Sequence, residues 1–178
     1  MKTNIALIGF MGTGKTAVGQ LLSNKLRLNF IEMDALIELR AGKTIPQIFE
    51  QGGEIAFREL EIEVARQVAQ KERVVIACGG GLVLNRINID RLRQGAVIVY
   101  LTASPLVTLK RVSKQAGKRP LLEVTEPLDT IRLMIRNREP YYKQAADVTI
   151  NTSMLSTEAV ANKIIEKLKK DENFDWLE

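Results

Sequence analysis

The sequence of 178 residues contains no histidine and only one cysteine, Cys78. Without histidine, a histidine-based catalytic triad and an imidazole zinc site are both excluded, and a single cysteine cannot form an internal disulfide. Any bound metal should therefore be held by oxygen ligands, which favours Mg²⁺. Cys78 itself is interpreted as a small core residue without a chemical role.

Aromatic residues are also scarce, at 5% of the chain, although the formal charge is +5. The basic residues form no block or stripe and have few aromatic neighbours that could stack on bases, so we expect no nucleic-acid partner. We assign the excess positive charge to a few arginines that face small anionic ligands. No apolar run is long enough for a membrane span or a signal peptide, so we expect no membrane partner and a cytoplasmic location.

The length and a hydrophobic content of 46% predict one domain, residues 1–178, which we expect to be a monomer. Apolar strands alternate with amphipathic helices, which is typical of an α/β fold with a parallel sheet. We expect strands over residues 4–8, 29–33, 73–78, 95–101 and 147–150. Helices are expected over residues 17–26, 35–40, 44–53, 54–70, 87–92, 104–112, 128–145 (kinked or restarted at Pro140) and 157–169, followed by a frayed tail.

A glycine-rich segment after the first strand, residues 9–16, reads Gly-Phe-Met-Gly-Thr-Gly-Lys-Thr. This is G-x-x-x-x-G-K-[ST], the phosphate-binding loop of P-loop NTPases, between a strand and a helix. We call it the phosphate loop. Its glycines let successive N–H groups point at phosphate oxygens, and the helix adds its positive N-terminal end. Lys15 would contact the β- and γ-phosphates, and the Thr16 hydroxyl would ligate Mg²⁺. The expected ATP contacts here are Gly12, Thr13, Gly14, Lys15, Thr16 and Ala17.

Two other interpretations of the phosphate loop are weaker. A plain glycine-rich turn would not need Lys15 and Thr16 at the start of the helix. A dinucleotide fingerprint would match Gly12, Gly14 and Ala17, but the pyrophosphate of a dinucleotide needs neither a γ-phosphate clamp nor a metal hydroxyl.

Two carboxylates, Glu32 and Asp34, end the second predicted strand. They are two residues apart, so on an extended backbone they share a face, and the carboxyl end of a parallel strand would place them beside the phosphate loop. Asp34 could instead cap the helix predicted over 35–40. In the functional interpretation, Asp34 orients an acceptor hydroxyl and takes its proton.

Features that suit a second anionic ligand lie further along the chain. Arg58 is one turn into the helix predicted over 54–70, although it could simply form a surface ion pair with Glu54 or Glu61. Three successive glycines, Gly79–Gly81, follow a buried strand. They predict close approach of the backbone to a ligand, or else a plain loop.

A basic segment bounded by proline lies within residues 113–125. We interpret these residues as a mobile lid that brings Arg119 over the phosphates, with an ordinary surface loop as the alternative. Together with Lys15 and Mg²⁺, Arg119 would neutralise the charge that develops around the γ-phosphate. A closed lid would also exclude water and so prevent hydrolysis of ATP.

These motifs, in order and over nearly the whole chain, resemble those of shikimate kinase. The matching residues are the phosphate loop, Met33-Asp34-x-x-Ile37-Glu38, Gly42-x-x-Ile45-x-x-Ile48-Phe49, Gly53-Glu54-x-x-Phe57-Arg58-x-x-Glu61, Gly79-Gly80-Gly81, Arg119-Pro120-Leu121-Leu122 and Arg138-x-Pro140-x-Tyr142. The resemblance implies a nucleoside-monophosphate-kinase-like fold, with a five-stranded parallel sheet in the order 2-3-1-4-5 flanked by helices. It also implies a helical substrate-binding insertion over about residues 34–61 and a lid over about 113–125.

The activity that the resemblance implies is ATP-dependent phosphorylation of the 3-hydroxyl of shikimate, a step toward chorismate and the aromatic amino acids. By the same resemblance, Asp34 would contact the ring hydroxyls, and Arg58 and Arg138 would bind the carboxylate through paired hydrogen bonds. Gly80 and Gly81 would lie against the ring.

On the nucleotide side, the resemblance implies that Arg119 contacts the phosphates and that Arg111 stacks on or flanks adenine. The sequence departs from the family pattern at two places. The family usually has aspartate at the position of Glu32, a residue that typically holds Mg²⁺ through water. The turn Asn151–Met154 lacks an arginine that is often found there.

Two other functions fit parts of the pattern. A related small-molecule kinase, such as a gluconate kinase, would share the core but lack this pair of arginines. A regulatory nucleotide-binding module would use the phosphate loop and the lid as a switch without phosphorylating a metabolite. A guanine-nucleotide switch is disfavoured because neither D-x-x-G nor N-K-x-D is present.

Overall fold

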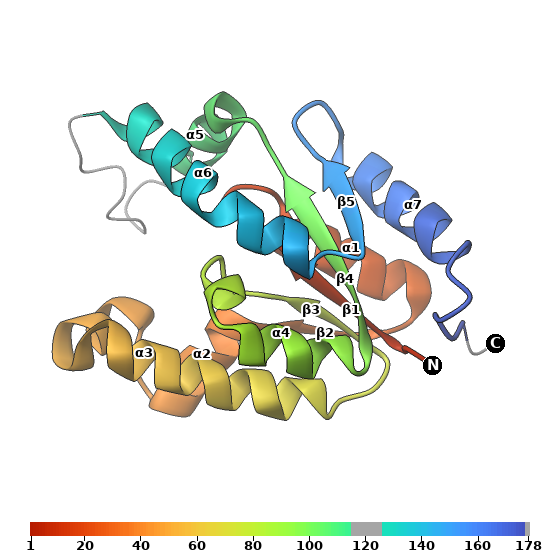
Figure 1. Ribbon diagram of the computed structural model, residues 1–178, viewed down its shortest axis with the longest axis horizontal. Helices are drawn as coiled ribbons and strands as arrows, with labels where there is room; N and C mark the ends of the chain where they lie inside the picture. Colours follow the sequence, from red (N-terminus) through yellow and green to blue (C-terminus); the bar gives the residue numbers. More distant parts are fainter. Residues whose placement is uncertain (115–125, 177–178) are drawn as a thin grey trace.

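A central parallel sheet of five strands organises the computed structural model (Figure 1), which describes residues 1–114 and 126–176. The strand order is β2-β3-β1-β4-β5, as predicted. The three central strands are almost entirely buried, whereas β2 and β5 lie at the edges. The strands are β1 (Asn4–Ile8), β2 (Asn29–Glu32), β3 (Val74–Ala77), β4 (Ala96–Thr102) and β5 (Val148–Asn151).

Helices cover both faces of this sheet (Figure 1). Because side chains alternate along a strand, Ile5 and Leu7 of β1 pack with α1 and α7, whereas Ala6 and Ile8 face the opposite core with α3, α4 and α6. The helices are α1 (Lys15–Leu26), α2 (Met33–Ala41), α3 (Ile45–Ala69), α4 (Arg86–Arg93), α5 (Pro105–Ser113), α6 (Pro127–Ala145) and α7 (Thr157–Leu168), with a short 3₁₀ helix, η1 (Leu82–Leu84).

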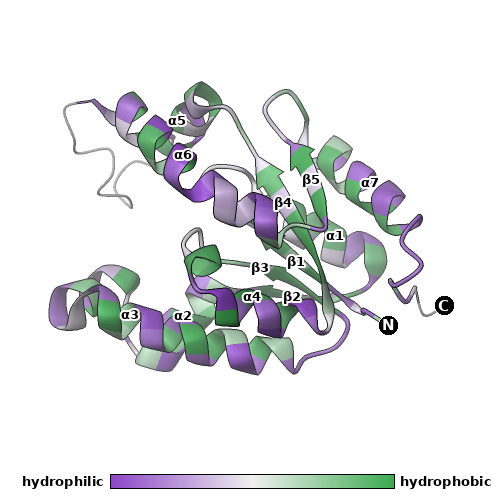
Figure 2. Cartoon of the chain, viewed as in Figure 1, coloured by the Kyte–Doolittle hydropathy of each residue, from purple (hydrophilic) through white to green (hydrophobic). Residues whose placement is uncertain are grey.

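The hydropathy of the chain follows this layering (Figure 2). The central strands are mainly apolar, and the helices alternate between apolar and polar residues, because each helix has one face on the sheet and one in solvent. None of the helices in the described ranges is both long and apolar enough to cross a membrane.

The helix α3 has the break that the two predicted helices, 44–53 and 54–70, required. It starts with a capping box between Thr44 and Gln47, and its backbone leaves helical geometry at Gly53, where φ is 67° and ψ is −169°. A side chain at Gly53 would meet nothing within 4 Å, so glycine is favoured there by the backbone conformation and not by space. The second part of α3 thus begins next to Glu54 and carries Arg58.

Three local details differ from the possibilities considered from the sequence. The alternative role of Asp34 as a helix cap is not present, because α2 begins at Met33 and Asp34 lies in its first turn. The helix α6 does not restart at Pro140, because it continues through it to Ala145. The tail is packed up to residue 176: Phe174 is buried, forms a β-bridge with Lys2 and contacts the ring of Trp176.

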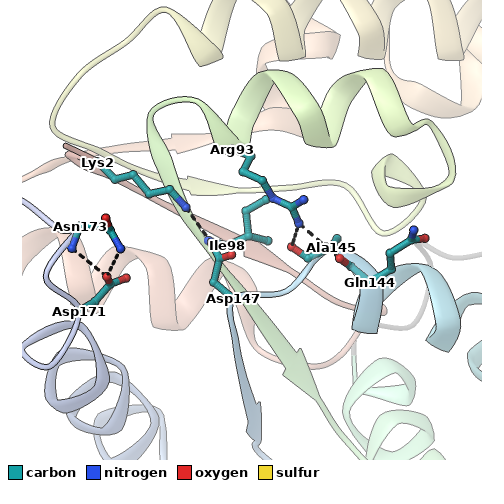
Figure 3. A network of polar contacts seen from close by, with 8 residues as sticks. All are labelled: Lys2, Arg93, Ile98, Gln144, Ala145, Asp147, Asp171 and Asn173. Atoms are coloured by element: carbon teal, nitrogen blue, oxygen red, sulfur yellow. Dashed lines mark hydrogen bonds and ion pairs between the residues drawn. The ribbon is translucent and has the colours of Figure 1, made fainter.

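A polar network ties several segments together at the N-terminal ends of the strands (Figure 3). The Asp147 carboxylate accepts hydrogen bonds from the Ile98 backbone N–H at 2.9 Å and from Lys2 Nζ at 3.1 Å. Arg93 Nη2 donates to the Ala145 carbonyl at 2.7 Å. These contacts join α4, the end of α6 and the two strands β4 and β5.

Candidate active site

The phosphate loop lies at the opposite end of the sheet, directly after β1. Lys15 Nζ donates to the carbonyl oxygens of Gly9 and Phe10, at 2.9 and 3.0 Å. A Cβ at Gly9 would lie 2.2 Å from the Leu101 carbonyl oxygen, so only glycine fits between the loop and β4. The loop thus holds its lysine in place while being packed against the sheet.

Two further carbonyls of the phosphate loop are bound from outside the loop. Arg111 Nη1 donates to Gly12 O at 3.1 Å, and Thr152 Oγ1 donates to Thr13 O at 3.1 Å. A carbonyl and the next N–H point in opposite directions across a trans peptide, so these contacts direct the N–H groups of Thr13 and Gly14 away from Arg111 and Thr152. Such an arrangement of N–H groups forms an anion-binding concavity.

A hydroxyl and a carboxylate meet at the start of α1. Thr16 Oγ1 donates to Glu32 Oε1 at 2.6 Å, which leaves the oxygen lone pairs of the hydroxyl for a cation. Within residues 1–114 and 126–176, no group of three or more acidic or cysteine side chains could hold a metal by itself. The pair nevertheless fits Mg²⁺, which keeps several waters and is shared with substrate phosphates.

A buried carboxylate, Glu61, stands at the centre of the second half of the site. Its side chain is 1% exposed, and its Oε2 accepts from Arg58 Nη1 at 2.8 Å. Asp34 and Arg138 lie close enough for their charges to act on it. Burial raises the pKa of the Glu61 carboxyl, and the charge of Arg58 lowers it by a smaller amount. Arg58 also pairs with exposed Glu54, so both ion pairs considered from the sequence are present.

The three glycines Gly79–Gly81, which we call the glycine loop, lie between these charged side chains. A Cβ at Gly79 would be 2.8 Å from Asp34 Oδ1, and one at Gly81 would be 2.6 Å from Arg58 Nη2. A Cβ at Gly80 would make ordinary contacts, with Gly9 O at 3.7 Å and with Arg138 Nη1 at 3.9 Å. The glycine loop is therefore packed closely against the neighbouring side chains, and approach of its backbone to a ligand stays a prediction.

Helix α6 closes this half of the site. The Arg138 guanidinium lies 5.7 Å from the centre of the Phe10 ring, and its Nη1 is 3.4 Å from the Gly80 carbonyl oxygen. The Tyr142 hydroxyl donates to the same carbonyl at 2.5 Å. Arg138 therefore reaches both the phosphate loop and the glycine loop.

The structure brings together most of the residues that the sequence selected. The acceptor group is Asp34, Arg58, Gly80, Gly81 and Arg138, and the phosphate group is Gly12, Thr13, Gly14, Lys15, Thr16, Ala17 and Glu32. The two groups adjoin, because both Lys15 and Asp34 lie near the buried Cys78 thiol. Arg111 contacts the phosphate loop, and its role toward adenine stays a prediction. Arg119, with nearly all of the predicted lid, lies outside the described residues.

Sequence reasoning missed the contributions of Tyr142 and Thr152, and it treated Glu61 only as a surface partner. One signal was available for Tyr142: it follows Arg138 by four residues on a helix, so the two side chains share a face. Nothing near Thr152 in the sequence indicates that its hydroxyl meets the phosphate loop, because that contact joins segments far apart in the chain.

Comparisons with known proteins show the family to which the chain is similar. The family model described as shikimate kinase matches residues 11–169. The chain is 44% identical to the shikimate kinase of Thermodesulfovibrio yellowstonii over 96% of this chain and 97% of that protein. It is 46% identical to the one of Caldanaerobacter subterraneus subsp. tengcongensis over 91% and 94% of the two chains. The solved structure of shikimate kinase from Acinetobacter baumannii in complex with shikimate superposes with a TM-score of 0.91, at 35% identity, over 97% of this chain and 96% of that one.

Proposed function

This chain belongs to the shikimate kinase family, and we propose that it transfers the γ-phosphate of ATP to the 3-hydroxyl of shikimate, which yields shikimate 3-phosphate and ADP. It is an ATP-dependent kinase of aromatic amino-acid biosynthesis. The observation that best supports this reaction is the close approach of the phosphate loop to the group of residues assigned to the acceptor. Arg138 touches the glycine loop and also lies over Phe10 of the phosphate loop.

On the nucleotide side, the phosphate loop and Lys15 bind the β- and γ-phosphates. Thr16 would hold Mg²⁺ directly and Glu32 would hold it through water, which is supported by the hydrogen bond between the two side chains. When bound, Mg²⁺ would neutralise negative charge on the phosphate oxygens. Glu32 has one methylene more than the usual aspartate, and its contact with the Thr16 hydroxyl shows that this length still reaches the start of α1.

On the acceptor side, Arg58 and Arg138 bind the carboxylate of shikimate, and Glu61 holds Arg58 in its orientation. Asp34 accepts a hydrogen bond from the reacting hydroxyl and takes its proton as the bond to phosphorus forms. Gly80 and Gly81 lie against the ring. Two guanidinium groups give this site a preference for an acid over a neutral polyol.

Two further arginines would act on the nucleotide. Arg119, from the lid at about residues 113–125, would add positive charge at the transferred phosphoryl group, and closure would exclude water. Arg111 would flank adenine while its guanidinium remains bonded to Gly12 and Thr152.

The substrate-binding insertion would comprise about residues 34–61. We infer a monomer that works in the cytoplasm, where ATP is available, without a nucleic-acid or membrane partner.

The experiment that tests this function is coupled detection of ADP release from purified protein, ATP and Mg²⁺. Shikimate is compared with a no-acceptor control and with gluconate, and mass spectrometry identifies the product. We expect ADP release and a phosphorylated product only with shikimate. Release with gluconate alone would assign a different acceptor, and absence of release with either acid would favour a regulatory nucleotide-binding module.

A further inference from the structure

The hydroxyl of Tyr142 occupies a position that the packing of its ring does not explain. The residue is fully buried, and its ring stacks on Tyr100 with centroids 4.9 Å apart and planes at 14°. Phenylalanine would supply the same stacking. A buried phenol, however, must place its O–H on an acceptor, and here that acceptor is the Gly80 carbonyl, in the middle of the glycine loop.

Holding the Gly80 carbonyl also holds the next N–H. The peptide bonds among the described residues are all trans, so the Gly81 N–H points away from the carbonyl that Tyr142 binds. Glycine has the widest backbone freedom and no side chain that could anchor it. The glycine loop therefore depends on neighbouring residues for the orientation of its peptides, and Tyr142 supplies the short hydrogen bond.

The same contact sets the place of Arg138. Arg138 precedes Tyr142 by four residues on α6, so both side chains leave the same face of the helix. Arg138 Nη1 lies 3.4 Å from the Gly80 carbonyl, a longer contact than the 2.5 Å of the Tyr142 hydroxyl. The shorter bond from Tyr142 thus links α6 to the glycine loop on the helix face that also carries Arg138.

We propose that Tyr142 is a positioning residue for the acceptor: its hydroxyl orients the peptide between Gly80 and Gly81 and places Arg138 for the carboxylate of the substrate. The proposal rests on the proposed function for the identity of the acceptor. It assigns Tyr142 no contact with the substrate and no proton transfer. Burial raises the pKa of the Tyr142 phenol, in keeping with a group that remains a donor.

The test compares Tyr142→Phe with Tyr100→Phe. Each variant removes one hydroxyl oxygen from the same pair of stacked rings. Of the two hydroxyls, the one that bonds to the Gly80 carbonyl belongs to Tyr142. For Tyr142→Phe we expect the KM for shikimate to rise about three- to tenfold, which is the range for one lost hydrogen bond, with kcat and the KM for ATP within about twofold of wild type. Tyr100→Phe should leave all three constants within about twofold.

A second measurement does not depend on turnover. In protein labelled with ¹⁵N-glycine, the spectrum contains at most the 12 glycine amides of the chain. We expect the Gly81 amide to shift in Tyr142→Phe and to remain in place in Tyr100→Phe. The proposal is overturned if Gly81 does not move, if the KM values for ATP and shikimate rise together, or if Tyr100→Phe has the same effect. Failure of the proposed function would instead appear as wild-type protein that does not phosphorylate shikimate, and the amide shift would still decide the role of Tyr142.

Discussion

The two ends of the sheet use charged side chains in different ways. At the N-terminal end, the Asp147 carboxylate bonds a backbone N–H of β4 and the ammonium of Lys2, and so joins segments of the chain to one another. At the C-terminal end, Glu61 is more deeply buried, yet its Oε1 has no hydrogen-bond partner among the described residues. Its other oxygen holds Arg58, a residue of the acceptor site.

This difference separates stability from function. Contacts among backbone and side chains at the N-terminal end contribute to folding. At the C-terminal end, carboxylates and arginines lie close together in a partly desolvated site. Their burial costs free energy of folding, and charged groups with such a cost are typical of binding sites. Substitutions at the N-terminal end should therefore change stability with little effect on kinetics, whereas substitutions of the site residues at the C-terminal end should change kinetics.

The largest effect is expected from Asp34→Asn, because the amide can still contact a hydroxyl but cannot take its proton. We expect kcat to fall about a thousandfold, within the usual range for loss of a general base. Binding of ATP, measured by calorimetry, should be nearly unchanged. Turnover close to that of wild type would remove Asp34 from the mechanism.

Arg58→Ala should raise the KM for shikimate about ten- to a hundredfold, since a charge-assisted contact with the carboxylate is lost. It also leaves Glu61 buried without its partner, so the thermal midpoint should fall. The double variant Arg58→Ala/Glu61→Gln should recover the midpoint but not the affinity. Arg138→Ala is expected to weaken shikimate binding similarly. Unchanged shikimate binding in both single arginine variants would contradict the assignment of these arginines to the carboxylate.

At the other end of the sheet, Asp147→Ala should lower the free energy of unfolding by about 1–3 kcal/mol, because the Ile98 N–H and Lys2 lose their acceptor. Denaturant unfolding would measure this change, and steady-state kinetics should show KM values for ATP and shikimate within about twofold of wild type. A kinetic defect without loss of stability would contradict the division between the two ends.

A smaller effect is expected from the pH dependence of Glu61. Because burial raises its pKa in the folded state, folding favours the protonated form, and wild-type protein should lose stability as the pH rises through the interval between the ordinary and the raised pKa. Glu61→Gln cannot titrate, so its stability relative to wild type should increase over that interval. Thermal midpoints of Glu61→Gln and wild type as a function of pH would show this. A constant difference between Glu61→Gln and wild type would refute the effect.

The smallest effect concerns Cys78, which lies at the functional end of β3 but belongs to the core. Burial raises the pKa of its thiol to about 12, so at pH 8 very little reactive thiolate is present. We expect iodoacetamide to leave the native protein unmodified and to label the thiol after unfolding in guanidinium. Equal labelling rates in the two states would show that the site opens far more than its packing indicates.

The three central strands were predictable because they are mainly apolar runs, whereas the edge strands β2 and β5 are short and partly polar. The strand order followed from the resemblance carried by the motifs. The phosphate loop was predictable from spacing alone, since its chemistry depends on neighbouring residues.

Contacts between segments far apart in the chain could not be predicted from the sequence. The burial of Phe174 depends on a bridge to Lys2, and the bond from Tyr142 to Gly80 joins residues 62 positions apart. Asp34 lies at the predicted edge of the sheet, but α2 begins at Met33, two residues before the expected start at residue 35, because helix boundaries depend on packing.

The contacts of Lys15 with its own loop have a consequence for conformational entropy. Ordering a lysine side chain costs up to about 2 kcal/mol of rotamer entropy, and two carbonyls of the phosphate loop already hold this ammonium in the folded protein. The loss of freedom therefore occurs once, when the chain folds, and is not repeated each time a nucleotide binds. A longer or differently shaped cation, as in Lys15→Arg, would keep the charge but not this preorganisation.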